Sequence, residues 1–306
     1  MDLSKIKGSI WFDGKVVDWQ DANVHLLTHT LHYGLGVFEG VRAYNTPKGP
    51  SIFRLQDHTE RLFSSAETVS MRIPFSQIEL NEAHKEVIKL NQLTEAYIRP
   101  MCFYGSEGMG LRADNLEVHC MVAAWEWPSY MEPKAREMGI KVKLSSHRRQ
   151  VRNPVSSAKV NGNYVHSIVA LNEALAEGFD EALMLDSEGN VAEGSGENIF
   201  IVKDNLLITP DLEASLDGIT RRTILDLAKE LNINYEIKKL KFEDVLRADE
   251  AFFSGTAAEV VPINSLDNKL IGNGKRGPLT EQLQNTYFDQ VRGVREANHN
   301  WHTLVE

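Results

Sequence analysis

Apolar residues recur along the chain at two spacings, one typical of strands and the other of helices. In the opening segment SIWFDGKVVDW, the pair Asp13-Gly14 lies between two apolar runs. This pair can adopt the two positive φ angles of a type I′ turn, so the segment predicts a β-hairpin. Further strands are predicted where β-branched and aromatic residues dominate, at residues 36–44, 51–55, 95–105 and 116–127.

Two helices are predicted in the first half, at residues 57–71 and 76–91, where apolar residues lie three or four positions apart. Their apolar positions are Leu62, Ala66 and Val69 in the first helix and Ile78, Val87 and Leu90 in the second. In the second half, strands are expected at 139–147, 181–186, 198–210 and 234–240, and helices at 164–179, 218–232 and 278–294. The pattern predicts an α/β fold of the α+β kind.

The chain has 306 residues, more than a single hydrophobic core usually supports, so two domains are expected. The segment PSYMEPKAREMG interrupts the apolar pattern with two prolines and several charges, which is typical of a linker. We therefore predict a small N-terminal domain at residues 1–127, a linker at 128–137 and a larger domain at 138–306.

Composition and charge exclude several classes of partner. The net charge of −10 argues against nucleic acid or an anionic membrane as the main partner. The start of the chain has no apolar signal core, and no apolar run approaches the ~18 residues of a membrane span. Cys102 and Cys120 lie in separate apolar runs without metal-type spacing. These features predict a cytoplasmic, reduced protein.

Two segments of the second half carry candidate chemistry. In SSAKVNGNYV, Lys159 stands among small residues just before a predicted helix, where a desolvated amine could form a Schiff base with an aldehyde. In VAEGSGENIF, Gly194 and Gly196 let the backbone approach a flat ring, and Glu193 could keep a pyridine nitrogen protonated. Taken singly, a solvent-exposed lysine and a glycine turn with a solvated acid explain these segments at least as well.

Two further segments suit a phosphate. Gly218-Ile219-Thr220 opens a predicted helix, where unpaired N–H groups and the positive end of the helix dipole attract an anion. Ser254-Gly255-Thr256 ends an apolar strand and could supply a second cradle of N–H and hydroxyl groups. A plain N-cap is the alternative for Thr220. An aldehyde, a ring nitrogen and a phosphate occur together in pyridoxal 5′-phosphate.

The segments HYGLGVFEGVRAY, HTERL, AYIRP, SSAKVNGNY, EGSGENIF, LDGITRRT and SGTAAE together resemble the class IV pyridoxal-phosphate aminotransferases, and among them the branched-chain amino acid aminotransferases. The resemblance runs in order from about residue 8 to 290. It departs at Val160-Asn161, where many relatives carry two small residues. The resemblance implies a two-domain fold with the cofactor at the domain interface, the small domain carrying the substrate pocket and the large one binding pyridoxal phosphate.

The resemblance also implies the roles of individual residues. Lys159 is expected to carry the Schiff base and to move the proton during transamination. Tyr164 is expected at the ring's phenolic oxygen, Glu193 at the pyridine nitrogen and Leu216 on the ring face. The residues expected to hold the phosphate are Arg61, Gly218, Ile219, Thr220, Gly255 and Thr256.

For the substrates, the resemblance implies an apolar pocket for the branched side chains of leucine, isoleucine and valine. Arg99 is expected to meet the γ-carboxylate of glutamate or 2-oxoglutarate at the pocket edge, and a structural ion pair is the alternative for this arginine. The expected pocket walls are Tyr33, Phe38, Leu111, Trp127 and Tyr130. The α-carboxylate is assigned to Tyr97 and to the turn at Thr256, Ala257 and Ala258. The family also implies a homo-oligomer, either a dimer or a hexamer.

Other functions stay open on the sequence alone. A D-amino acid aminotransferase or an aminodeoxychorismate lyase shares the family's cofactor fold. A Schiff-base aldolase without cofactor and a non-catalytic vitamin carrier are alternatives from other classes. His25, His29 and His32 are closely spaced, but no acidic or thiol partner completes a metal site, and we predict none.

Overall fold

The structure is a computed structural model, and it describes residues 2–127, 134–151, 153–295 and 300–306. By its internal contacts the chain divides into two compact units. Unit 1 contains residues 1–128, 158–162 and 291–306, and unit 2 contains residues 129–157 and 163–290. Two segments from the second half of the sequence, one of them carrying Lys159, thus belong to unit 1.

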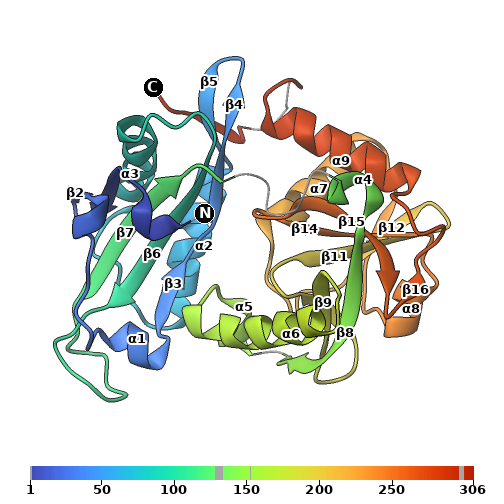
Figure 1. The fold of residues 1–306 in the computed structure, drawn as a ribbon, viewed down its shortest axis with the longest axis horizontal. Coiled ribbons are helices and arrows are strands. Elements are labelled where there is room, and N and C mark those ends of the chain that lie inside the picture. The colour runs from blue at the N-terminus through green and yellow to red at the C-terminus, as the bar shows by residue number, and fades with distance from the viewer. Residues whose placement is uncertain (1, 128–133, 152, 296–299) are drawn as a thin grey trace. The chain divides into compact units, whose positions relative to one another are not determined.

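Unit 1 is built on an eight-stranded sheet in the order β17-β5-β4-β6-β7-β1-β2, with β3 paired to β6 (Figure 1). Its strands are β1 (Ser9–Phe12), β2 (Lys15–Asp18), β3 (Gly36–Phe38), β4 (Val41–Thr46), β5 (Gly49–Phe53), β6 (Ala96–Tyr104), β7 (Val118–Trp125) and β17 (His302–Leu304). Its helices are η1 (Leu3–Lys5), η2 (Trp19–Asp21), α1 (His29–Tyr33), α2 (Leu55–Thr68) and α3 (Gln77–Leu90). Helices α2 and α3 share one apolar core with the sheet.

Unit 2 is built on a nine-stranded sheet in the order β10-β9-β8-β15-β14-β11-β12-β13, with β16 paired to β15. Its strands are β8 (Ile140–Arg149), β9 (Glu181–Asp186), β10 (Val191–Gly194), β11 (Asn198–Lys203), β12 (Leu206–Thr209), β13 (Tyr235–Ile237), β14 (Glu250–Gly255), β15 (Glu259–Leu266) and β16 (Lys269–Leu270). The helices are α4 (Ala135–Met138), α5 (Pro154–Ser157), α6 (Tyr164–Ala176), α7 (Ile219–Glu230), α8 (Phe242–Leu246) and α9 (Pro278–Val291), and the 3₁₀ turn η3 (Asn161–Asn163) spans the boundary of the two units.

The predicted hairpin is confirmed. β1 pairs antiparallel with β2, and the turn residues Asp13 and Gly14 have φ angles of 47° and 81°. Glycine has no Cβ, and aspartate tolerates positive φ angles better than most residues, so both fit this turn. The turn at Asp13-Gly14 therefore joins the first two paired strands of the chain.

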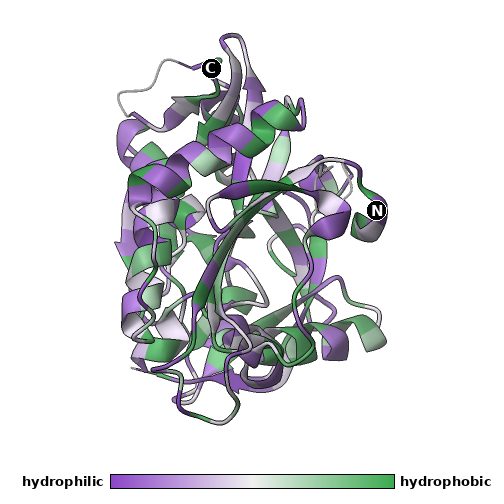
Figure 2. Ribbon diagram, turned by 90° about the vertical axis from the view of Figure 1, so that its left-hand side faces the viewer, coloured by the Kyte–Doolittle hydropathy of each residue, from purple (hydrophilic) through white to green (hydrophobic). Residues whose placement is uncertain are grey.

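Of the three apolar positions named for helix α3, only Val87 is buried. Its capping box is formed by Ser76 and Glu79, and it buries Leu80, His84 and Val87, whereas Ile78 and Leu90 are exposed. The buried face is apolar apart from this one histidine. The helices in Figure 2 carry hydrophilic and hydrophobic segments in alternation, as helices with one buried face do. In the part of the chain that the structure describes, no helix is long and apolar enough to cross a bilayer.

Candidate active site

Lys159 is held in unit 1 through its own backbone. Its carbonyl oxygen accepts a hydrogen bond from Phe38 N at 3.2 Å, and its N–H donates to Ser65 Oγ at 3.0 Å. The next residue, Val160, is buried and forms an isolated β-bridge with Val37. The side chain is half-buried, with its Nζ 4.9 Å from the centre of the Phe38 ring. The lysine is therefore anchored against an aromatic wall and not extended into solvent.

Helix α2 directs His58, Arg61 and Ser65 toward this segment, because positions three or four apart share one helical face. Arg61 forms an ion pair with Glu39. Its Nε donates to Glu39 Oε1 at 2.7 Å, and its Nη2 donates to Glu39 Oε2 at 2.8 Å. The Nδ1 of His58 lies 2.8 Å from the same Oε2. Glu39 and His58 are absent from the predicted site, and only their closeness to Phe38 and Arg61 in sequence could have suggested them.

The charge states of this cluster follow from burial and pairing. Burial by itself raises the pKa of Glu39, but the Arg61 charge and the hydrogen bonds from His58 and Arg61 outweigh it and hold that pKa well below its usual range. Burial lowers the pKa of His58, and the bond to Glu39 opposes this only in part. At neutral pH the cluster thus consists of a carboxylate, a guanidinium and a neutral imidazole.

Arg99 lies on β6 among aromatic side chains. Its guanidinium carbon is 4.6 Å from the Phe38 ring centre and 5.4 Å from that of Tyr97, and its Nη2 donates to the Tyr97 hydroxyl at 3.1 Å. Tyr97 in turn contacts Trp127 with 4.6 Å between ring centres, and its hydroxyl packs where Gly40 lacks a Cβ. Within the described residues Arg99 has no ion pair, and its buried Nε has no hydrogen-bond partner. A structural ion pair therefore does not explain this arginine there.

A largely apolar pocket of about 560 Å³ lies on this face of the unit 1 sheet. Arg99 and Trp127 are among the predicted site residues that line it, and Met101, Phe103 and Trp125 add apolar walls. Tyr33 and Leu111 do not line it. They belong to two exposed segments that meet where Gly110 N donates to the Tyr33 hydroxyl at 3.1 Å. Tyr130 lies outside the described residues.

In unit 2, Glu193 at the end of β10 is almost fully buried and is held by three groups. Its Oε1 is 3.1 Å from Arg149 Nη2, and its Oε2 accepts from Leu216 N at 3.0 Å and from Asn198 Nδ2 at 3.3 Å. Arg149 also donates to two backbone carbonyl oxygens, which fixes its direction. Arg149 and Asn198 are absent from the predicted site: Arg149 ends a run of polar residues in β8, and Asn198 is the first residue of the apolar strand β11. The carboxylate is thus oriented, as a partner for a ring nitrogen must be.

The two predicted phosphate segments also lie in unit 2. Gly218 is the N-cap of α7, so the N–H groups of Ile219 and Thr220 fall in the first turn, where helix geometry leaves them without intrahelical acceptors. A side chain on Gly218 would collide with Asn198 Oδ1. Ser254 is buried, and its Oγ has no hydrogen-bond partner among the described residues. Gly255 ends β14, and Thr256 with Ala257 and Ala258 forms the turn before β15.

Tyr164 is the first residue of α6 and is half-buried. The remaining predicted cofactor residue, Leu216, meets Asn198 through its carbonyl oxygen at 2.9 Å. Unit 2 thus contains Tyr164, Glu193, Leu216, Gly218, Ile219, Thr220, Gly255 and Thr256, and unit 1 contains Phe38, Arg61, Tyr97, Arg99, Trp127 and Lys159.

The three clustered histidines bind backbone groups. His29 Nε2 lies 2.8 Å from Gly110 O, His32 Nε2 lies 3.0 Å from Leu26 O, and His25 Nδ1 accepts from Leu27 N at 3.0 Å. His25 and His32 thus bond their own segment, whereas His29 bonds the loop between β6 and β7.

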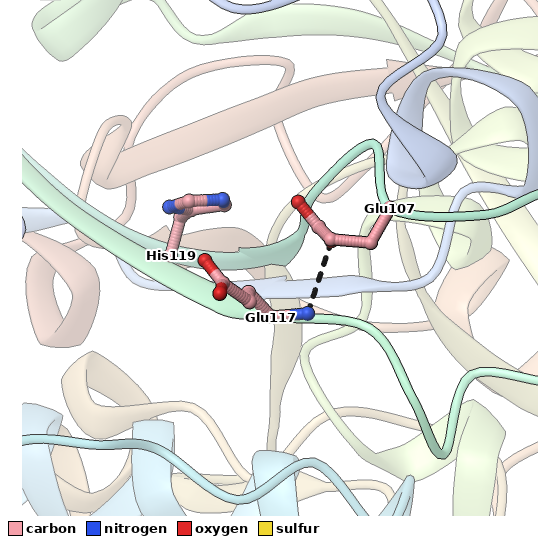
Figure 3. Close-up of side chains that lie close together, drawn as sticks. All are labelled: Glu107, Glu117 and His119. Carbon is pink, nitrogen blue, oxygen red and sulfur yellow. Dashed lines mark hydrogen bonds between the residues drawn. The ribbon is translucent and has the colours of Figure 1, made fainter.

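A different group, Glu107, Glu117 and His119, has side-chain atoms within 4.8 Å of one another in the described part of the chain (Figure 3). Glu107 uses a carboxylate oxygen to accept Glu117 N, and His119 uses Nδ1 to meet Asp13. Both glutamates are exposed. These contacts explain why the three side chains lie close together: they belong to a surface network that holds the loop between β6 and β7.

Comparisons with known proteins agree with this geometry. The family model described as "Amino-transferase class IV" matches residues 36–266. A branched-chain-amino-acid aminotransferase of Pseudomonas aeruginosa is 56% identical over 307 residues and is covered completely, as is this chain.

Solved structures extend the similarity to the fold. A crystal structure of the Escherichia coli branched-chain amino acid aminotransferase matches with a TM-score of 0.96 and 41% identity, covering 98% of this chain and 100% of the other. A branched-chain amino acid aminotransferase from Thermobaculum terrenum, solved in its PLP-form, matches with a TM-score of 0.90 and 31% identity, covering 98% of this chain and 99% of the other.

Proposed function

Because the chain belongs to the class IV aminotransferase family, we propose that it transfers the amino group of L-leucine, L-isoleucine or L-valine to 2-oxoglutarate, using pyridoxal 5′-phosphate. The observation that carries the proposal is the placement of Lys159. Its amine is anchored against Phe38, in the same unit as an apolar pocket that contains Arg99. Few other functions need a fixed amine, an apolar pocket and a carboxylate-binding cation together.

The residues present fit the cofactor. The Ser254 hydroxyl is buried without a partner among the described residues, which is costly unless a ligand supplies one, and the α7 N-terminus offers N–H groups to an anion. Bound pyridoxal phosphate supplies an aldehyde that accepts an amine and a ring that stores electrons from the substrate Cα. We assign the phosphate to the α7 N-terminus, Thr256 and Arg61, and the ring nitrogen to Glu193.

The chain's own groups then carry out the proton chemistry. Lys159 Nζ would hold the cofactor's aldehyde carbon and, when free, would carry the proton between the substrate Cα and that carbon, because its backbone bonds to Phe38 and Ser65 keep it in place. Glu193 keeps the ring nitrogen protonated, and its own direction is fixed by Arg149 and Leu216 N. Tyr164 is assigned to the phenolic oxygen of the ring.

The substrate side requires one pocket for two different side chains. Burying a branched aliphatic side chain gains about 0.8 kcal/mol for each CH₂ group, and the aromatic walls offer that burial. A γ-carboxylate needs a cation, and Arg99 has a buried Nε without a partner in the described residues. We assign the α-carboxylate to Tyr97 and to the Thr256–Ala258 turn. Aromatic rings hold the Arg99 guanidinium at the pocket, so no carboxylate of the protein has to stand in the pocket to position it.

Reductive trapping tests the proposal directly. Borohydride added to the protein with pyridoxal phosphate should attach the label to Lys159, and L-leucine with 2-oxoglutarate should yield L-glutamate. The matched control is Lys143→Ala, since Lys143 also lies over an aromatic ring, 5.8 Å from Phe179, but pairs with Glu177. Lys159→Ala should abolish turnover and Lys143→Ala should not. A label at another lysine, or faster turnover of D-alanine or aminodeoxychorismate than of leucine, refutes the assignment.

We further propose that the protein is a cytoplasmic homo-oligomer, either a dimer or a hexamer. Support comes from apolar side chains that are exposed in the isolated chain, on α6 and in the loops around α1. The most exposed of these are Leu26, Leu31, Leu111, Val165 and Ile168. Sedimentation velocity at micromolar concentration should show at least a dimer, and a monomer contradicts the proposal.

A further inference from the structure

Glu39 follows β3 directly, and its side chain has no exposed surface. A buried carboxylate is costly unless its partners are well placed, and removing one partner leaves a large penalty. Here Arg61 provides two hydrogen bonds and His58 a third. The roles assigned so far use Arg61 but give no function to the buried acid behind it.

The shape of the guanidinium decides what this pairing does. The group is planar, with its N–H bonds in fixed directions. The bonds to Glu39 occupy the edge formed by Nε and Nη2, so the edge that carries Nη1 is turned away from Glu39. Arg61 is also the outermost of the three side chains, with 12% of its surface exposed against 3% for His58 and none for Glu39. The carboxylate thus lies behind the arginine and sets its direction.

We propose that Glu39 is a positioning residue for phosphate recognition. It holds Arg61 with the Nη1 edge directed at the cofactor phosphate, and His58 in turn fixes Glu39. This inference rests on the proposed function, in which Arg61 binds that phosphate. Arginine side chains lose considerable rotamer freedom when they bind, and an arginine already held in place loses less. The corresponding gain in phosphate affinity is about tenfold.

Glu39 also lowers the affinity for phosphate, because its negative charge repels a phosphate dianion. Glu39→Asp separates the two effects. Aspartate keeps the charge but is one CH₂ shorter, so it cannot meet both Nε and Nη2 of Arg61 in the present backbone position. If position matters, this variant loses phosphate affinity although the charge is unchanged.

The experiment compares two ligands that differ only in the phosphate. Cofactor-free wild-type and Glu39→Asp proteins are titrated with pyridoxal 5′-phosphate and, separately, with pyridoxal, following the absorbance of the bound ligand. We expect the Kd for pyridoxal phosphate to rise about tenfold in the variant, with the Kd for pyridoxal unchanged. An equal loss for both ligands, or no loss for either, overturns the inference.

The matched control is Asp57→Glu, on the same helix. Arg54 donates to Asp57 through Nε at 2.9 Å and Nη2 at 3.0 Å, so this pair has the same form but no assigned ligand. Both Kd values should stay at the wild-type level. If Glu39→Asp does not fold, His58→Leu provides the test, because it keeps the Glu39–Arg61 ion pair and removes only the hydrogen bond from the imidazole to Glu39. It should raise the Kd for pyridoxal phosphate alone.

The titration distinguishes a failure of the proposed function from a failure of the role of Glu39. Wild-type protein that binds neither ligand refutes the proposed function and this inference together. Wild-type protein that prefers pyridoxal phosphate, with a Glu39→Asp variant that keeps the same preference, refutes only the role of Glu39.

Discussion

Part of the acid sensitivity of unit 1 should come from the buried histidine His84. His84 on α3 is 1% exposed, its Nδ1 lies 2.6 Å from Leu80 O, and its Nε2 has no hydrogen-bond partner among the described residues. Burial is the main cause that lowers the pKa of His84 from 6.5 to about 4, and the bond to the Leu80 carbonyl only partly opposes it. The imidazole is therefore neutral in the folded protein at pH 6, although an exposed imidazole is largely protonated there.

The sign of the effect follows from this difference. Between pH 6.5 and about 4 the unfolded chain binds a proton that folded His84 does not. Stability is therefore fully present above pH 6.5 and is lost as the pH falls through this window. A shift from 6.5 to about 4, at about 1.4 kcal/mol for each pH unit, corresponds to about 3 kcal/mol. That is a large share of the ~5–15 kcal/mol that stabilises a typical domain.

Urea unfolding followed by tryptophan fluorescence reports on unit 1, which contains His84, because all five tryptophans lie in that unit. His84→Asn keeps a donor for Leu80 O but cannot be protonated. From pH 7.5 to 4, the wild type should lose about 3 kcal/mol more unfolding free energy than this variant. His32→Asn, at an exposed histidine, should leave the pH dependence unchanged. Identical pH dependence in the wild type and His84→Asn would refute the argument.

Three further predictions concern the site and the fold. Arg99→Ala should slow the glutamate half-reaction at least ~10-fold more than the leucine half-reaction, because only glutamate brings a second carboxylate. Single-turnover kinetics with each amino acid measure the two rates, and equal losses contradict the prediction. Glu193→Gln should lower kcat ~10²-fold or more by weakening protonation of the ring, as steady-state assays with leucine will show, and an unchanged kcat removes that role. Ser76→Ala, which breaks the α3 capping box, should cost about 1 kcal/mol in urea unfolding, whereas Ser64→Ala, in the interior of α2, should cost less.

The local elements were predictable because their signals are local. The Asp13-Gly14 turn, the strand runs and the amphipathic helices each depend on residues within a few positions of one another. The burial of His84 on α3 was not predictable, because histidine is polar by type and this one is buried only through its place in the tertiary structure. A pattern based on residue class assigns such a histidine to solvent.

The site residues also divide into those that the local sequence indicates and those that it does not. Lys159, Glu193 and Arg99 stand out in sequence because each is a charged residue in an unusual context. Glu39 and Arg149 do not, since their importance comes from Arg61 and Glu193, which lie 22 and 44 positions away. No local pattern encodes such pairs. The pairing of β17 with β5, which links the chain's last residues to its first fifty or so, is invisible for the same reason.

The assignment of residues 158–162 to unit 1 has a consequence for hybrid enzymes assembled from two relatives. By sequence order alone, a crossover near residue 128 keeps Lys159 with its own half of the gene. In the folded protein, however, the lysine would keep its sequence neighbours but exchange Val37, Phe38 and Ser65, which fix its backbone. Hybrids in which the short lysine segment travels with the first 128 residues should therefore retain their catalytic geometry better than hybrids made with a single cut.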